Sequence, residues 1–278
     1  MKEGYFVTRT YKAGKVWEKI KYWVPGKRPS RCGRSTKAEI KKQEQNETQT
    51  IRAAARVLNE NFRAGDVILG LDYSDEGLET IILKQSQDGV VFESEEEKLE
   101  CMYEAANHEM KLFLRRVKRE CDKQGIVFKY GVAVTSDMDG KTGELVRVHH
   151  HMVINKEALE IAQEKWPFGG VHFEPLSNKP DYTDVAGYFI RQTRKIKDAK
   201  KFVCSRNLVR PVPKDRIVPS NAEIRVPAGG VLLHRSEFKP GRPQYIRYLM
   251  TQKETKVDDV GICVVPARRG RKNNLKEL

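Results

Sequence analysis

The 278-residue sequence lacks the long apolar segments that place proteins in membranes. No apolar run approaches the ~20 residues that a membrane-spanning helix needs. The first residues, MKEGYFVTRTYKAGK, lack the apolar stretch of a signal peptide. We therefore expect a protein that has no membrane partner and stays in the cytoplasm.

Cysteine is sparse and is not arranged for metal binding or for disulfide pairing. The five cysteines are odd in number, widely spread and never spaced as CxxC. They are Cys32, Cys101, Cys121, Cys204 and Cys263. This pattern argues against a zinc ribbon and against a disulfide framework, and it fits reduced, mostly buried thiols. No internal repeat is visible either.

A nucleotide-binding loop is also missing. The segment DGKTGEL contains Gly140-Lys141-Thr142, which matches only the end of the P-loop pattern GxxxxGK[ST]. The first glycine of that pattern would fall at position 135, which is Thr135. The segment also reads as a β-turn with no helix after it. The chain therefore has no recognisable helicase motor of its own.

Positive charge is abundant. The chain has 52 Lys and Arg against 38 Asp and Glu, a net charge of +14, and its pI is near 9.5. A pI above ~9 is typical of proteins that bind nucleic acids. The alternative is a soluble protein that happens to be basic.

Apolar periodicity predicts a mixture of strands and helices. Ser94, with Glu97 three residues later, marks the start of an amphipathic helix of about 25 residues. The other predicted segments are a hairpin at 4–24, a helix starting near 35, strands at 65–73, 127–136 and 145–155, helices at 156–165 and 181–195, and short strands within 205–250. Strands and helices do not alternate strictly. We therefore predict an α+β fold with a central antiparallel sheet flanked by helices.

Three consecutive histidines occupy the predicted strand LVRVHHHMVIN, residues 145–155. Side chains alternate between the two faces of a strand. His149 and His151 should therefore point to one face, about 7 Å apart at Cα, and His150 to the other. Two imidazoles on one face can share a metal ion, because histidine is the commonest metal ligand among side chains. The alternative is a structural histidine cluster. A purification tag is disfavoured by the internal, apolar setting.

A tyrosine lies within a basic helical segment, DYTDVAGYFIRQTRKIKDAKK, at Tyr188. Asp198 is the single acidic residue between Phe189 and Lys201, a stretch that suits phosphate contact. The stretch holds six basic residues: Arg191, Arg194, Lys195, Lys197, Lys200 and Lys201. A tyrosine hydroxyl beside a cation can act as a nucleophile. The alternative is a core tyrosine on an amphipathic helix.

Four blocks together resemble the HUH endonucleases, and most closely the rolling-circle replication initiators of Gram-positive plasmids, phages and integrative elements. They follow the family's order. They are NFRAGDVILGLDY (61–73), VRVHHHMVI (146–154), DVAGYFIRQTRK (184–195) and KFVCSRNLVRP (201–211). The resemblance implies a palm-like, ferredoxin-like core and spans roughly residues 1–212. It predicts a nicking domain at 1–212 that includes the N-terminal hairpin, an extension of uncertain role at 213–265, and a basic disordered tail at 266–278.

The resemblance assigns roles to particular residues. His149 and His151 would ligate Mg²⁺ or Mn²⁺, and Tyr188 would be the nucleophile. The family often has a lysine three residues after the tyrosine. Here that position is Arg191, which is still cationic but does not give up its proton readily, so Lys195, the nearest lysine, would take part of that catalytic role. Basic side chains in and after this helix are expected to contact DNA: Arg194, Lys197, Lys200, Lys201 and Arg206.

Two features depart from relatives within the superfamily. Relatives with two tyrosines have the second one four residues after the first; Gln192 stands there, which implies a single-tyrosine enzyme. Many relatives also have a glutamate as third metal ligand, near Ser136 here. Asp137, Asp139 or Glu144 could substitute, and Asp72 is another candidate. None of them is favoured over the others.

The activity implied is a metal-dependent transesterification on single-stranded or hairpin origin DNA, with a 5′-phosphotyrosine and a free 3′-OH as products. A host polymerase would extend the 3′-OH, and a separate host helicase would unwind the duplex in the bacterial cytoplasm. A conjugative relaxase or an HUH transposase would use the same chemistry. A non-catalytic DNA-binding regulator on this fold is an alternative from another class, because Ser136 and Arg191 depart from the family pattern.

Overall fold

The structure is a computed structural model that describes residues 4–26, 36–85, 92, 94–133, 136–138, 145–193, 201–237, 242–251 and 262–264. Within these ranges, the side chains of 36–44, 95–96, 99, 136–138, 145–147 and 262–264 are not described. The chain divides into two compact units. Unit 1 combines Met1–Cys32 with Val212–Leu278, and unit 2 is Gly33–Pro211.

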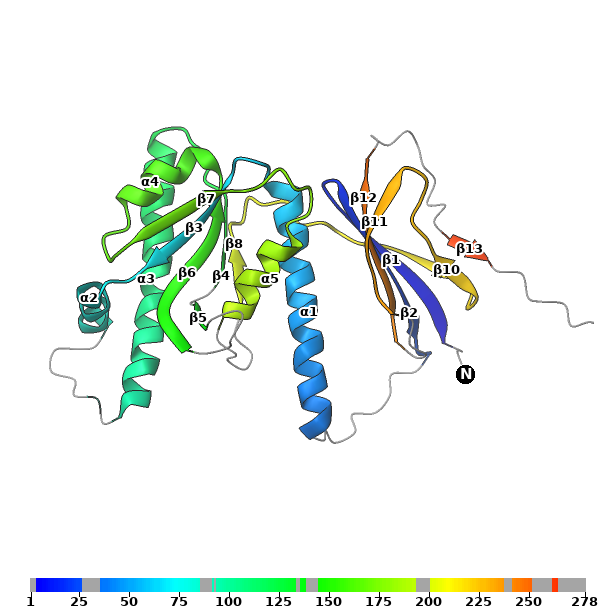
Figure 1. Cartoon of the computed structure of the whole chain (residues 1–278), viewed down its shortest axis with the longest axis horizontal. Helices are drawn as coiled ribbons and strands as arrows, with labels where there is room; N and C mark the ends of the chain where they lie inside the picture. The colour runs from blue at the N-terminus through cyan, green and yellow to red at the C-terminus, as the bar shows by residue number, and fades with distance from the viewer. Residues whose placement is uncertain are drawn as a thin grey trace, which may run out of the picture. The chain divides into compact units, whose positions relative to one another are not determined.

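Unit 2 is built on an antiparallel sheet with the strand order β7-β3-β6-β4-β8, in which β5 also pairs with β6 (Figure 1). Its strands are β3 (Val67–Asp72), β4 (Tyr130–Ala133), β5 (Ser136–Met138), β6 (Leu145–Ile154), β7 (Val171–Pro175) and β8 (Phe202–Cys204). Residues of β3 alternate strictly between buried and half-buried positions, as expected for a strand with different layers on its two faces. The histidine strand β6 lies in the middle of this sheet.

Helices cover both faces of the sheet in unit 2 (Figure 1). One face packs against α2 (Asp75–Gln85), α3 (Glu95–Lys123) and α4 (Leu159–Glu164), which follows a 3₁₀ turn at Lys156–Ala158. The other face packs against α1 (Thr36–Asn61) and α5 (Thr183–Gln192). None of the described helices combines the length and apolar character needed to cross a lipid bilayer.

The predicted α+β class, with a central antiparallel sheet flanked by helices, is confirmed. Helix α3 begins as predicted after Ser94, whose Oγ accepts a hydrogen bond from the Glu97 backbone N–H at 3.2 Å. Helix α2 was not predicted, since its short sequence DEGLETIILKQ has only a weak apolar face. The predicted strand at 127–136 is shorter, because β4 begins at Tyr130.

Unit 1 contains a second antiparallel sheet, with the strand order β11-β12-β2-β1-β9. Its strands are β1 (Tyr5–Ala13), β2 (Val16–Val24), β9 (Lys214–Val218), β11 (Gly230–Arg235) and β12 (Gln244–Met250). A two-residue turn joins β1 to β2, and Gly14 adopts the positive φ of 57° that such turns require. A separate pair is formed by β10 (Ala222–Ile224) and β13 (Ile262–Val264).

The predicted domain boundaries differ from the structure at the N-terminus. The hairpin at 4–24 forms as predicted, but it does not belong with the histidine strand. Strand β1 pairs with β9 and β2 pairs with β12, so the hairpin and the predicted extension at 213–265 build one sheet. Sequence patterns missed this because the paired strands are about 200 residues apart. The predicted tail at 266–278 lies outside the described residues.

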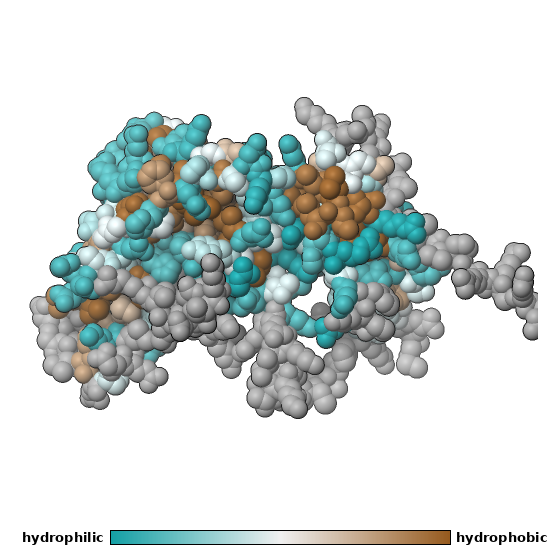
Figure 2. Space-filling model, viewed as in Figure 1, coloured by the Kyte–Doolittle hydropathy of each residue, from teal (hydrophilic) through white to brown (hydrophobic). Residues whose placement is uncertain are grey.

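The two edges of the unit 1 sheet differ in character. Figure 2 shows apolar side chains at the surface over β11, where Val231, Leu232 and Leu233 are all exposed. Strand β9, at the opposite edge, exposes Lys214 and Arg216. Charged side chains on an edge strand discourage pairing with another chain. Two of the five residues of β9 are positively charged.

Candidate metal and nucleophile site

The histidines of β6 separate onto two faces, as the strand periodicity predicted. His150 points into the core beneath α3, is fully buried, and shares a hydrogen bond between its Nε2 and the Tyr73 hydroxyl at 3.0 Å. Burial and the neighbouring histidines lower the pKa of His150 to about 3, so it is neutral near pH 7. His149 and His151 point to the other face, toward α5. The strand thus has one structural histidine and two at a candidate site.

His149 and His151 are spaced like two ligands of one ion. Their Nε2 atoms are 3.0 Å apart, and their ring centroids are 4.7 Å apart. An octahedral cation with ligands at about 2.1 Å places adjacent ligand atoms about 3.0 Å apart. The spacing of the two nitrogens therefore fits two adjacent ligands of one octahedral divalent cation.

The imidazole of His151 is held neutral and in a fixed orientation. Burial lowers its pKa to about 4, the positive charge that His149 can take adds to this effect, and an interaction with the Gln192 side chain opposes it. The ring stacks on Phe189 with a centroid distance of 5.6 Å and an interplanar angle of 11°. A neutral, immobilised imidazole suits metal ligation, because the ligand must present a free nitrogen lone pair.

Hydrogen bonds to α1 and to its own first turn fix the start of α5. The Tyr182 backbone N–H donates to Asn59 Oδ1 of α1 at 2.7 Å. The Thr183 backbone N–H and hydroxyl both donate to Asp181 Oδ1, at 3.0 and 2.6 Å. Fully buried apolar residues, including Phe189, then pack the helix between α1 and the sheet. These contacts determine which side of α5 faces the histidines.

Tyr188 lies on the side of α5 that faces β6. Its ring centroid is 4.9 Å from that of His151, and its side chain is 46% exposed. The phenol is thus next to the candidate ligands and still accessible to a substrate. The structure therefore brings together His149, His151 and Tyr188, the three residues on which the predicted chemistry depends.

The proposed third ligands are placed in part. Asp72 lies directly opposite His149 on β3, and the backbone of Ser136 lies opposite His149 on β5. Glu144 and Asp139 lie outside the described residues, as do the side chains of Ser136 and Asp137. Among the described side chains, no three from His, Cys, Asp and Glu are grouped closely enough to hold one ion.

Gln192 is a buried polar residue at the site whose role sequence reasoning missed. It is only 7% exposed, and its Oε1 makes no hydrogen bond to any described residue. Its side chain nevertheless acts on the His151 ring. Gln192 follows Tyr188 by four residues, so the helical repeat places both on one face. That spacing was readable from the sequence, but only the position of α5 shows that this face meets His151.

A second pair of groups missed by sequence reasoning lies on the same face of the sheet. His172 of β7 and Asp72 of β3 form an ion pair when the histidine is protonated, with Nε2 3.0 Å from Oδ2. Gly70 lies opposite both His151 and His172. A Cβ at Gly70 would lie 3.9 Å from His151 Nδ1 and 3.8 Å from the His172 Cβ, so larger side chains would fill the space between the rings.

The predicted basic contacts are only partly described. The Arg191 guanidinium lies against Gly187, with Nη1 3.0 Å from the point that a Cβ there would occupy. Lys201 forms an ion pair with Glu47 of α1, at 3.7 Å, and Arg206 is exposed after β8. The remaining predicted basic residues lie outside the described part of the chain: Arg194, Lys195, Lys197 and Lys200.

Comparisons with protein-family models, with curated protein sequences and with solved structures find no match to this chain. The interpretation of the site therefore depends on the geometry of His149, His151 and Tyr188, together with the motifs of the sequence.

Proposed function

We propose that this chain is an HUH-type endonuclease that nicks and rejoins single-stranded DNA to initiate rolling-circle replication. The observation that supports the proposal is the grouping of two imidazoles with one accessible phenol. The His149 and His151 Nε2 atoms are 3.0 Å apart, and the Tyr188 ring lies 4.9 Å from that of His151. One backbone phosphate could reach all three groups.

Tyr188 is the nucleophile of the proposed reaction. Its oxygen attacks phosphorus, the bond from phosphorus to the 3′-oxygen breaks, and a 5′-phosphotyrosine and a 3′-OH result. The phenol proton is released, and the departing 3′-oxygen takes up a proton. Because the phosphotyrosine keeps a phosphodiester bond, a later 3′-OH can reseal the strand without ATP. Until then the free 3′-OH serves as a primer for a host polymerase.

His149 and His151 are the proposed ligands, and their surroundings prepare them for this role. A bound Mg²⁺ or Mn²⁺ would polarise the phosphate and offset negative charge in the transition state. Stacking on Phe189 fixes the plane of His151, and burial keeps this ring neutral. The Gln192 oxygen is a further candidate ligand, since it is buried beside His151 and makes no hydrogen bond to any described residue.

The proposed partners follow from the reaction. The substrate is single-stranded or hairpin origin DNA, because a strand must bend to present one phosphate to a compact site. A host helicase is required, since the sequence contains no complete P-loop. A relaxase or a transposase would share the chemistry. A non-catalytic DNA-binding regulator is the second candidate, because the described side chains provide no third His, Cys, Asp or Glu ligand.

The test is covalent capture of DNA. The full chain is mixed with Mn²⁺ and 5′- or 3′-labelled single-stranded oligonucleotides that tile the DNA flanking its gene. We expect a denaturant-resistant adduct on one fragment, which Tyr188→Phe abolishes. Tyr182→Phe is the matched control, because Tyr182 is buried in the same segment and should not affect the adduct. Binding without any adduct from the wild-type protein would favour the regulator.

A further inference from the structure

The excess positive charge of the chain lies entirely in unit 1. Of the 52 Lys and Arg residues, 23 belong to unit 1, which has 9 of the 38 Asp and Glu residues. Unit 2 has the remaining 29 basic and 29 acidic residues. The net charge is therefore +14 for unit 1 and zero for unit 2, which contains the candidate site. A charge imbalance of this size acts on polyanionic partners over distances beyond direct contact.

Among the described residues of unit 1, six cations share one face of the five-stranded sheet. Residues opposite each other in neighbouring antiparallel strands share a face, so the register identifies all side chains on it. This face, here called the basic face, has no carboxylate on any of its five strands. Its cations are Lys12, Lys19, Lys21, Lys214, Arg216 and Arg235.

The other face of the same sheet is neutral. Its two arginines are matched by two carboxylates. Arg9 binds Asp215 through two hydrogen bonds of 2.8 and 2.6 Å, and Arg247 lies opposite Glu18 in the register. The asymmetry between the faces is therefore a property of the fold and not of composition alone.

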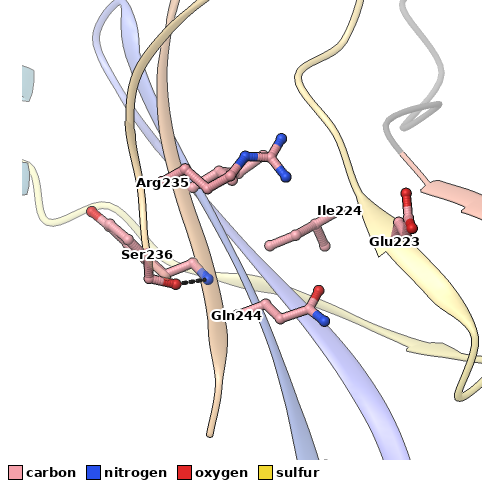
Figure 3. Close-up of a pocket in the computed structure, with 7 residues that line it drawn as sticks. Glu223, Ile224, Arg235, Ser236 and Gln244 are labelled. Atoms are coloured by element: carbon pink, nitrogen blue, oxygen red, sulfur yellow. Dashed lines mark hydrogen bonds between the residues drawn. The ribbon is translucent and has the colours of Figure 1, made fainter. Parts of the chain in front are cut away.

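Strand β10 covers part of the basic face. The Lys21 ammonium donates to the carbonyl oxygens of Ser220 and Ala222, at 2.7 and 2.6 Å, and is buried. In Figure 3, the side chains of Arg235 and Gln244 point toward Ile224, a residue of β10. Strand β10 therefore lies on the basic face of the sheet.

Four cations of the basic face stay exposed: Lys12, Lys214, Arg216 and Arg235. The one carboxylate that β10 adds nearby, Glu223, is bound to Arg225 at 3.1 Å. None of the five strands places a carboxylate on the same face as these four cations.

Three of the four aromatic rings on this face are closed to stacking, because lysines cover two of them and Tyr248 is buried, whereas Trp23 is 54% exposed. The Lys12 ammonium lies 3.9 Å from the centre of a Trp17 ring, and the Lys21 ammonium lies 4.8 Å from that of Phe6. Proteins that bind single strands use open aromatic surfaces on which bases stack. A face that offers four exposed cations and a single open ring suits contact with the phosphate backbone of a duplex better than the stacking of successive bases.

We infer that unit 1 is a docking module for double-stranded DNA, which it binds by phosphate contact through the exposed cations of the basic face. The inference deepens the proposed function and rests on it for the identity of the polyanion as DNA. Unit 1 would hold the duplex part of the origin, while the chemistry takes place in unit 2.

The test measures binding of a labelled 25-base-pair duplex to the full chain by fluorescence anisotropy, in EDTA and over a range of salt concentrations. The variant Lys214→Gln/Arg216→Gln removes two exposed charges from β9. We expect about tenfold weaker binding at 0.1 M salt and a salt dependence reduced by about two in log–log slope. The control Lys111→Gln/Arg115→Gln removes two exposed charges from α3 of unit 2 and should change neither value.

Several results would overturn the inference. One is a β9 variant that keeps its melting temperature and shows the wild-type salt dependence of duplex binding. Another is an α3 control that loses as much duplex affinity as the β9 variant. Loss of single-strand binding without loss of duplex binding would do the same, as would binding to phosphatidylserine vesicles but not to duplex. The duplex measurement is made in EDTA, where no nicking takes place, so it does not depend on the chemistry of unit 2. Failure of nicking and failure of docking are therefore separately visible.

Discussion

Unit 2 and unit 1 divide reactive groups and charge between them. Unit 2 contains the paired imidazoles and the accessible tyrosine, yet its 29 basic and 29 acidic residues cancel. Unit 1 contributes all of the net positive charge and has only one described histidine, His234. A phosphate cut at a precise position needs fixed geometry, whereas a DNA backbone held at any sequence needs only charge. The two proposed tasks, nicking by unit 2 and DNA docking by unit 1, can therefore be tested independently.

The largest expected effect tests whether unit 2 alone provides the chemistry. His151→Ala should lower adduct formation about a thousandfold, since a bound cation can contribute several kcal/mol to the transition state. Calorimetric titration of Mn²⁺ should show lost binding. Duplex affinity in EDTA should be unchanged, and the Lys214→Gln/Arg216→Gln variant should bind Mn²⁺ normally. Adduct formation by His151→Ala at the wild-type rate would remove the histidines from the mechanism.

A second effect separates the units by pH. The pKa values of His150 and His151 are lowered to about 3 and about 4 in the fold, against 6.5 when unfolded. Below pH 6.5 the unfolded chain therefore binds more protons than the folded chain, so unit 2 loses stability as the pH falls toward 4. The loss is at most about 1.4 kcal/mol per histidine per pH unit.

Hydrogen exchange measured between pH 7 and 5 reports on both units in one sample. Strands β3 and β6 of unit 2 should lose protection on acidification, and β1 and β2 of unit 1 should change less. In the wild type, both His150 and His151 take up protons on unfolding in this pH range, whereas in His150→Gln only His151 does, so the pH dependence of stability should be smaller. If hydrogen-exchange protection in His150→Gln falls with pH as steeply as in the wild type, the buried His150 is not the cause of the pH dependence.

The smallest expected effect concerns the residue that supports His151. Gln192→Leu preserves volume but removes the amide, and it should weaken Mn²⁺ binding about tenfold, as is usual when a group that orients a ligand is lost. Gln192→Glu keeps an oxygen at that position and should bind Mn²⁺ at least as well as the wild type. Equal affinities for Mn²⁺ in the wild type and Gln192→Leu would show that Gln192 only fills space.

Local sequence patterns predicted the elements of the site well. Alternation along 145–155 placed His149 and His151 on one face and His150 on the other, as β6 has them. The serine cap before α3 and the turn between β1 and β2 were also readable, because both depend on residues within a few positions of each other.

Contacts across the sheets were not readable in the same way. The ion pair of Asp72 with His172, and the meeting of Gln192 with His151, require segments that lie many residues apart in the chain. The N-terminal hairpin was assigned to the wrong unit for the same reason.

The sequence by itself determined that two imidazoles share one strand face, that Tyr188 lies in a helix, and that the chain is strongly basic. Periodicity and composition are local properties, and no tertiary contact is needed to establish them. Tertiary structure decided that Tyr188 meets His151, and that six cations share one face of a sheet built from both ends of the chain. Strand pairing and helix docking set those distances, and both depend on packing between segments far apart in sequence.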